Sequence, residues 1–321
     1  MPLDPKVQRF LQRLAATNPP SALALSVEER RAGLAQLLSF SGAPEEVAAI
    51  DELEFPGPGG ELRIRSYTPL GARTGDRLPG IVYFHGGGLI AGTLDTHDPI
   101  CRSLSNASRC RLLSVDYRLA PEHRFPAALE DGCAALQWIG AHTAELYVAR
   151  EQLGVAGDSA GATLAAAVCQ MSVAAGTVPL GFQFLLCPIM DLVAESESRR
   201  SLAHGYLVDR DTLEHDLRHY LSDETQRADP RVSPLRAADV ARLPPTAIHT
   251  AEFDPLRDEG HSYAERLEQA GVRTLYRCHP GMIHLFYGLR GLITYAGAAF
   301  AEMGADIRSL LAPPQPPEGM R

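Results

Sequence analysis

The feature that most constrains this chain is the run Gly157-Asp158-Ser159-Ala160-Gly161, which stands between two segments of different composition. Residues 153–156 are apolar and predict a buried strand, whereas the small residues of 160–168 predict a closely packed helix. A sharp turn between them exposes Ser159 at its apex, and the flanking glycines let strand and helix approach closely. Because G-x-S-x-G also arises by chance, its interpretation depends on what else the sequence carries.

Composition excludes several classes of function. The chain has 321 residues, 45% of them hydrophobic, which suits either two domains or one large α/β domain with a cap. Its net charge is −9 and it has no lysine- or arginine-rich block, so nucleic-acid binding is not expected. No window resembles a membrane span, and the first 18 residues lack the apolar region of an export signal. We therefore expect a soluble, cytoplasmic protein.

The six cysteines are scattered and form no C-x-x-C pair. We expect them to act as small, mostly buried hydrophobic residues. A disulfide between Cys101 and Cys110 is the alternative, but it does not suit a chain without an export signal.

The hydrophobic pattern changes along the chain from helical to strand-like. Two amphipathic helices come first, one around Val7 and Phe10 and one around Leu34. From residue 50, alternating residues predict two strands joined by a glycine- and proline-rich turn. Six short apolar strands then alternate with helices, at residues 81–84, 112–115, 153–156, 182–186, 246–250 and 274–278. This order predicts an α/β fold with a mostly parallel sheet covered by helices on both faces.

The segment 191–234 interrupts the alternation, because it is polar, contains two candidate helices and contributes no strand. We predict that it joins the N-terminal helices of residues 1–49 in a helical cap above the sheet. The α/β core then comprises residues 50–190 and 235–312, and the proline-rich residues 313–321 are expected to be disordered. Simple packing of the N-terminal helices against the core is the alternative to a mobile cap.

A second chemical motif, His85-Gly86-Gly87-Gly88, follows the predicted strand 81–84. Acyl transfer needs N–H donors aimed at the oxygen that becomes negative in the tetrahedral intermediate, and glycine amides can supply them. We predict that Gly86, Gly87 and Ala160 form this oxyanion hole. The motif fits neither a phosphate-binding loop nor a dinucleotide-binding fingerprint. His85 is expected to be a structural hydrogen-bonding residue and not a base.

Two polar residues follow the last two predicted strands: Asp254 comes after residues 246–250, and His284 comes after residues 274–278. Because the carboxyl ends of parallel strands open onto one crevice, we expect Ser159, Asp254 and His284 to meet there. The chain order serine, aspartate, histidine also fits this interpretation. Ser159 would be the nucleophile, His284 its general base, and Asp254 the group that orients the histidine.

Alternatives exist for two of these roles. Asp258 or Glu252 could replace Asp254, although Asp254 is nearest to the strand end. His279 could replace His284, but it lies nearer to the strand and Pro280 follows it. We also expect the substrate to contact residues beside the predicted site, namely Gly88, Leu89, Asp158 and Leu285.

Other polar clusters are interpreted as structural. The run His215-Asp216-Leu217-Arg218-His219 mimics a zinc-binding helix, but aspartate replaces the glutamate base, and a solvated helix face explains it better. Asp95, His97 and Asp98 are interpreted as the first turn of a helix. No metal is therefore expected. The stretch 116–122 is interpreted as a packing motif in which Arg118 and Glu122 pair with each other.

Together the motifs resemble those of the hormone-sensitive-lipase-like (bacterial family IV) esterases of the α/β-hydrolase superfamily. The resemblance extends from about residue 80 to residue 286 and depends on residues 85–88, 116–122, 157–161, 254–260 and 284–286. It implies hydrolysis of short- to medium-chain acyl esters, an N-terminal helical cap, no cofactor, and a homodimer formed through the last sheet edge. The chain departs from the family pattern at Leu89, Ala162 and Leu285, which affects the expected substrate preference and not the reaction type.

The sequence therefore predicts a serine carboxylesterase that acts on a small-molecule ester through an acyl-enzyme intermediate. A non-catalytic small-ligand receptor on the same fold is the alternative from another class, and the presence of His284 argues against it. An amidase or a lactonase would use the same three residues, so the motifs alone do not separate these activities.

Overall fold

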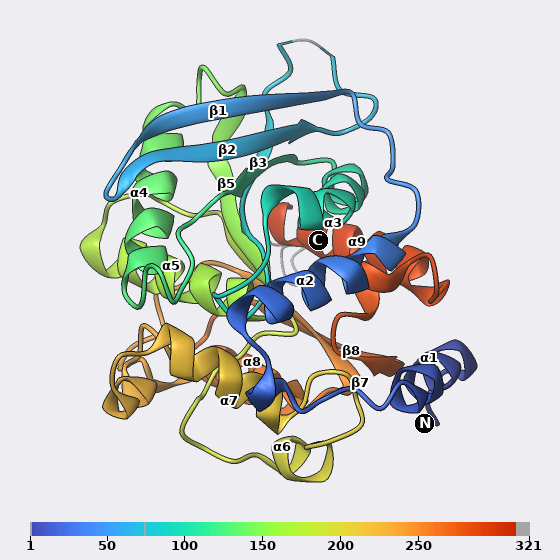
Figure 1. Cartoon of the computed structure of the whole chain (residues 1–321). Helices are drawn as coiled ribbons and strands as arrows, with labels where there is room; N and C mark the ends of the chain where they lie inside the picture. Colours follow the sequence, from blue (N-terminus) through green and yellow to red (C-terminus); the bar gives the residue numbers. More distant parts are fainter. Residues whose placement is uncertain (1, 74, 313–321) are drawn as a thin grey trace, which may run out of the picture.

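An eight-stranded sheet runs through the molecule in the order β1-β2-β4-β3-β5-β6-β7-β8 (Figure 1). The computed structural model describes residues 2–73 and 75–312, so the tail predicted to be disordered lies outside the described residues. The strands are β1 Ala49–Gly57, β2 Gly60–Thr68, β3 Leu78–Phe84, β4 Arg111–Val115, β5 Val148–Asp158, β6 Phe182–Leu186, β7 Thr246–Phe253 and β8 Thr274–Ile283. Only β1 and β2 run antiparallel to their neighbours. The predicted antiparallel entry and the parallel core are both confirmed.

The sheet explains where the chemistry-bearing segments lie. Strands β3, β5, β6, β7 and β8 are parallel, so their carboxyl ends point to the same edge. The loops that leave these ends begin with His85, Ser159, Cys187, Asp254 and His284, respectively. Residues far apart in the sequence therefore converge on one crevice.

Helices cover both faces of the sheet. On one face α3 (Leu94–Ser108) packs against α9 (Tyr295–Leu311), and on the other α4 (Ala127–Ala141) packs against α5 (Ala160–Ala175) (Figure 1). Helix α8 (Arg257–Gln269) packs on β7 and β8. A continuous cluster of buried apolar side chains fills the space between these layers, as expected for a sheet that is covered on both faces.

The two N-terminal helices take different positions. Helix α1 (Pro5–Ala16) begins at an Asp4 N-cap and lies beside β8, where the Asp4 amide donates to Gly281 O at 3.1 Å. Helix α2 (Val27–Leu38) begins at a capping box between Ser26 and Glu29 and extends across the carboxyl ends of the strands (Figure 1). Only α2, of these two helices, reaches the crevice.

The segment 191–234 forms α6 (Glu197–Ser201), α7 (Arg210–Tyr220) and short 3-10 turns, and these described residues add no strand to the sheet. Helix α7 packs against the short turn Ala22–Ala24 that precedes α2. One interpretation is wrong here: His215 and Asp216 do not form a solvated face, because their exposures are only 2% and 6%. Their side chains face α2, a contact that the sequence pattern could not reveal.

Two further expectations can be compared with the structure. All six cysteines are free, and four of them are buried. The predicted pair between Arg118 and Glu122 is wrong: Arg118 instead donates to Asp131 at 2.8 Å, and Glu122 pairs with Arg31 of α2 at 2.6 Å. Among the described residues, no helix is both long and apolar enough to span a membrane.

Candidate active site

Ser159 occupies the turn between β5 and α5 in a conformation that few non-glycine residues adopt. Its φ of 54° and ψ of −126° lie outside the usual regions, and its amide donates to Leu186 O at 2.8 Å. A Cβ on Gly157 would lie 2.3 Å from Gly161 O, and one on Gly161 would lie 2.1 Å from Phe84 O. Both positions therefore require glycine, and the tight turn holds the Ser159 side chain at the start of α5.

A continuous line of hydrogen bonds joins three of the predicted residues. The Ser159 Oγ and the His284 Nε2 are 2.9 Å apart, and the His284 Nδ1 lies 2.7 Å from the Asp254 Oδ2. The other Asp254 oxygen accepts from the Leu256 amide at 2.8 Å, which fixes the carboxylate. Asp254 is fully buried and His284 is 2% exposed. Burial lowers the pKa of His284, but the Asp254 carboxylate outweighs this effect, and the net pKa is raised.

The three alternative residues are engaged elsewhere. Asp258 accepts from the Ser198 amide at 2.7 Å, and Glu252 accepts from the Gly281 amide at 2.7 Å. His279 lies in β8 and shares a 3.0 Å hydrogen bond with His249. Its pKa is lowered to about 3, first by burial and then by His249. Their positions are those of structural residues.

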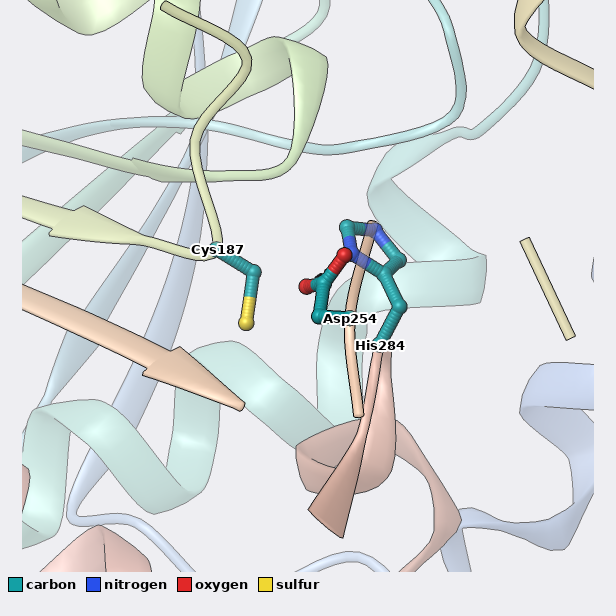
Figure 2. A group of neighbouring side chains, drawn as sticks. All are labelled: Cys187, Asp254 and His284. Carbon is teal, nitrogen blue, oxygen red and sulfur yellow. Dashed lines mark hydrogen bonds and ion pairs between the residues drawn. The ribbon is translucent and has the colours of Figure 1, made fainter. Parts of the chain in front are cut away.

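Figure 2 shows a group that the sequence analysis missed: the Cys187 thiol approaches the carboxylate of Asp254, which lies against the ring of His284. The nearest thiol, carboxylate and imidazole atoms lie within 4.8 Å of one another. All three side chains are of types that can bind a metal. However, the 2.7 Å between His284 Nδ1 and Asp254 Oδ2 is the distance of a hydrogen bond. Burial, and then the charge of Asp254, also raise the pKa of the Cys187 thiol well above its usual value, which disfavours a thiolate. The group therefore favours a proton between His284 and Asp254 over a metal thiolate.

The glycine loop after β3 differs from the prediction in one residue. The Gly86 amide donates to Asp158 Oδ1 at 2.9 Å, so the prediction that Gly86 points toward the reacting oxygen is wrong. The buried Asp158 carboxylate needs donors, and this amide is one of them. In the described part of the chain, the Gly87 and Gly88 amides donate to no protein acceptor, and both glycines line the same cavity as Ser159 and Ala160. The Ala160 amide is free of helical bonding because it is the first residue of α5.

Asp158 anchors this loop from beneath. Besides Gly86, its carboxylate accepts from the hydroxyls of Tyr83 at 2.5 Å and Tyr287 at 3.0 Å, and His97 Nε2 lies 3.6 Å away. Burial alone would raise the pKa of Asp158, but His97 and the tyrosine hydrogen bonds lower it to about 2. Although Asp158 adjoins the cavity, it is fully buried and its oxygens are occupied. It is therefore placed to support the loop, whereas the sequence analysis expected it to contact substrate.

His85 is also a structural residue, as predicted. It is fully buried, its Nδ1 lies 2.8 Å from Gly86 O, and its ring stacks on Tyr117 at 4.5 Å. Burial lowers the pKa of His85 to about 3, so the ring stays neutral.

A cavity that is partly open to solvent is lined by Ser159 and His284. All four residues predicted to contact substrate, Gly88, Leu89, Asp158 and Leu285, line this cavity. Both leucines have φ near +62° and thereby hold their loops against the cavity. Most of the remaining wall is apolar and comes from α2, α5, α7 and the connecting segments between β6 and β7: Leu34, Leu164, Ile189, Leu192, Val208, Leu213, Leu217 and Val232.

The wall also contains a charged pair that the sequence analysis did not anticipate. Arg30 of α2 and Asp216 of α7 pair across the cavity at 2.8 Å. Helical periodicity gives no signal for such a pair, because the two residues are 186 positions apart.

Comparisons with known proteins agree with this geometry. The sequence profile of the alpha/beta hydrolase fold matches residues 81–288. Carboxylesterase NlhH of Mycobacterium tuberculosis is 38% identical over 96% of this chain and 95% of its own length. The arylesterase of Saccharolobus solfataricus is 36% identical over 90% of this chain and 93% of its own.

Solved structures show the same similarity. An alpha/beta hydrolase enzyme from the metagenome of Lake Arreo, Spain, superposes with a TM-score of 0.92 at 39% identity, covering 96% of this chain and 98% of that one. A hyperthermophilic esterase from Pyrobaculum calidifontis superposes with a TM-score of 0.91 at 36% identity, covering 97% of this chain and all of the other.

Proposed function

This chain belongs to the hormone-sensitive-lipase-like carboxylesterases of the α/β-hydrolase family, and from that premise we propose that it hydrolyses short- to medium-chain acyl esters with Ser159 as its nucleophile. The observation that carries the assignment of residues is the hydrogen-bonded line from Ser159 through His284 to Asp254, which opens into an apolar cavity. A serine hydroxyl is a weak nucleophile unless such a base adjoins it.

The proposed reaction follows from the positions of the protons. His284 Nε2 takes the Ser159 hydroxyl proton as the Oγ attacks the ester carbonyl, and the positive imidazolium is stabilised by Asp254. The tetrahedral oxyanion accepts from the amides of Gly87, Gly88 and Ala160. When the intermediate collapses, His284 gives its proton to the departing alcohol and an acyl-enzyme remains. A water molecule, deprotonated by His284, then releases the acid and restores the serine.

The cavity wall supports the proposed substrate class. Its leucine-rich lining suits an uncharged ester with an apolar acyl chain. Relatives of this chain are named carboxylesterase, arylesterase and ethyl acetate hydrolase, which also points to small esters.

We also propose that α2 and residues 191–234 form a cap over the site. Both segments contribute to the cavity wall, and they contact each other through α7 and the turn before α2. Helix α1 packs beside β8 and supplies no residue to the cavity, so we exclude it from the cap.

Two further proposals concern the oligomeric state and the cellular location of the protein. Strand β8 ends the sheet, and an unpaired edge strand is a template for a second copy, so we propose a homodimer through β8. The six unpaired cysteines favour a reducing compartment such as the cytoplasm. Light scattering on the purified protein tests the first proposal, and cell fractionation tests the second.

Substitution Ser159→Ala tests the assignment. Hydrolysis of p-nitrophenyl butyrate should fall to the level of the uncatalysed reaction, while the circular dichroism spectrum and the unfolding midpoint stay unchanged. Ser172→Ala is the matched control, because Ser172 is a buried serine of the same helix that does not line the cavity. Full activity of the Ser159 variant would refute the proposal. Rates on a matched amide and lactone then measure how strictly the site prefers esters.

A further inference from the structure

The cavity wall contains a charged pair that the proposed reaction does not use. The Arg30 guanidinium donates to Asp216 through two bonds, Nε to Oδ1 at 3.1 Å and Nη2 to Oδ2 at 2.8 Å. Both side chains are largely buried, with exposures of 15% and 8%. Taking two charges out of water carries a desolvation penalty, so a pair at this place needs an explanation beyond general stability.

The carboxylate of this pair lies against the glycine loop of residues 86–88, which contains two of the proposed oxyanion donors. A Cβ on Gly88 would lie 1.9 Å from Asp216 Oδ2, which means that this oxygen is in contact with the Gly88 Cα. The Gly88 amide is one of the donors proposed for the oxyanion. An uncompensated negative charge beside that donor would oppose the negative oxygen that forms in the tetrahedral intermediate, and low dielectric surroundings would strengthen the effect.

Arg30 supplies the opposite charge at the same position. Its guanidinium stays protonated at any working pH and binds the carboxylate in a fixed geometry. Of the other charged groups, Asp158 and Asp254 are acids, and both raise the pKa of His284, whereas Arg30 lowers it. Arg231 also lines the cavity, but its guanidinium pairs with Asp229 at 2.6 Å. His215 touches Asp216 Oδ1 at 3.2 Å and is positive only when protonated.

We propose that Arg30 is a charge-compensating positioning residue: by neutralising Asp216 it allows the Gly88 loop to stabilise the oxyanion, and it thereby makes the N-terminal helix α2 part of the catalytic apparatus. The inference rests on the function proposed above, since it concerns the same oxyanion. It does not require Arg30 to touch the substrate. In this proposal the charge of Asp216 destabilises the oxyanion, and the charge of Arg30 offsets that effect.

This assignment predicts how the kcat values of three variants rank. Arg30→Met leaves Asp216 unpaired, and kcat for p-nitrophenyl butyrate should fall about tenfold to a hundredfold. Asp216→Asn removes the harmful charge, and kcat should stay within about threefold of the parent. The double variant Arg30→Met/Asp216→Asn should recover to within about threefold of Asp216→Asn, because no charge is left uncompensated. Assays belong above the pH at which His215 titrates, so that its proton cannot replace Arg30.

Two results would overturn the proposal. If the double variant is as slow as Arg30→Met, or if Asp216→Asn is as slow as Arg30→Met, the pair acts as a mechanical clamp between α2 and α7. The KM should change less than kcat, since the compensated charge develops in the transition state. In Arg30→Met the acid limb of kcat/KM should also move to higher pH, because a cation near His284 is lost; a purely structural role would leave this limb in place.

Arg227→Met is the matched control. Arg227 pairs with Glu214 of the same helix α7 at 2.9 Å, but neither residue lines the cavity. Its loss should leave kcat unchanged. The test also separates this inference from the proposed function: Ser159→Ala decides whether the serine reacts, whereas the Arg30 series decides only what surrounds the oxyanion.

Discussion

Replacing Asp158 with asparagine should weaken both the fold and the reaction, because one buried carboxylate holds the oxyanion loop in place. Asparagine keeps the shape and one acceptor oxygen but loses the charge. With the amide oxygen at the Oδ1 position, the hydrogen bonds from Tyr83 and Gly86 change from charge-assisted to neutral, and the bond with Tyr287 must reverse, because the amide nitrogen can only donate. At about 1 kcal/mol for each of three bonds, the change should cost about 3 kcal/mol of unfolding free energy.

The pKa of Asp158 gives a second route to this magnitude. Lowering that pKa from 3.8 to about 2 corresponds to about 2 kcal/mol in favour of the folded, charged form. The group contributes fully above its unfolded pKa, and the contribution is lost as the pH falls toward the folded value of about 2. The stability gap between parent and Asp158→Asn, measured by urea unfolding, should therefore be constant near neutral pH and shrink below about pH 4.

The effect on the reaction follows from Gly86. When its bond to residue 158 weakens, the neighbouring Gly87 and Gly88 amides lose their fixed direction. We expect kcat to fall about tenfold to a hundredfold, less than the full loss of an oxyanion donor. Asp306→Asn is the control: Asp306 accepts from His249 and Arg277, and its pKa is also lowered to about 2, but it lies outside the cavity. A destabilised Asp158→Asn enzyme with parental kcat would show that the loop does not depend on this carboxylate.

Three further predictions concern titratable groups. Burial lowers the pKa of His284, but Asp254 raises it by more, so the net pKa lies above the usual 6.5 and the acid limb of kcat/KM should lie above that pH. Asp254→Asn should move this limb to lower pH, and an unmoved limb would contradict the assignment. The pKa of buried His279 is lowered to about 3, so between about pH 6.5 and 3 the unfolded chain binds a proton that the folded chain does not. The unfolding free energy should therefore decline as the pH falls through this range. His279→Gln should reduce the slope of that decline, and an equal slope would point to other groups. In the native protein an aromatic disulfide reagent should react only with the half-buried Cys133 and Cys278, because the other four cysteines are buried. Burial raises the pKa of Cys133 to about 11, so even this thiol should react slowly near neutral pH. Rapid reaction of more than two thiols would disprove the buried placement of the others.

Some features followed from local sequence alone. The strand β6 was predicted at its observed bounds, and the other core strands were predicted short by one to seven residues. The turn at Ser159 could be anticipated because Gly157 and Gly161 allow an approach that no other residue permits. Asp254 and His284 could be paired with Ser159 because a parallel sheet brings the ends of its strands to one edge.

Other features depended on contacts between distant segments, which no local pattern encodes. Gly86 and Gly88 look alike in the sequence, and only the buried Asp158 decides that the amide of Gly86 is taken and that of Gly88 is left for the site. Likewise, nothing in the sequence of α7 indicates that Asp216 is buried, because its partner Arg30 comes from α2, 186 positions away.

The sequence by itself thus determined the order of strands and helices and the three side chains of the candidate triad, because periodicity and turn geometry act over a few residues. The tertiary structure alone decided which glycine amides remain without a protein acceptor in the cavity and which charges lie near them, because burial forces each polar group to find a partner and that partner can come from anywhere in the chain.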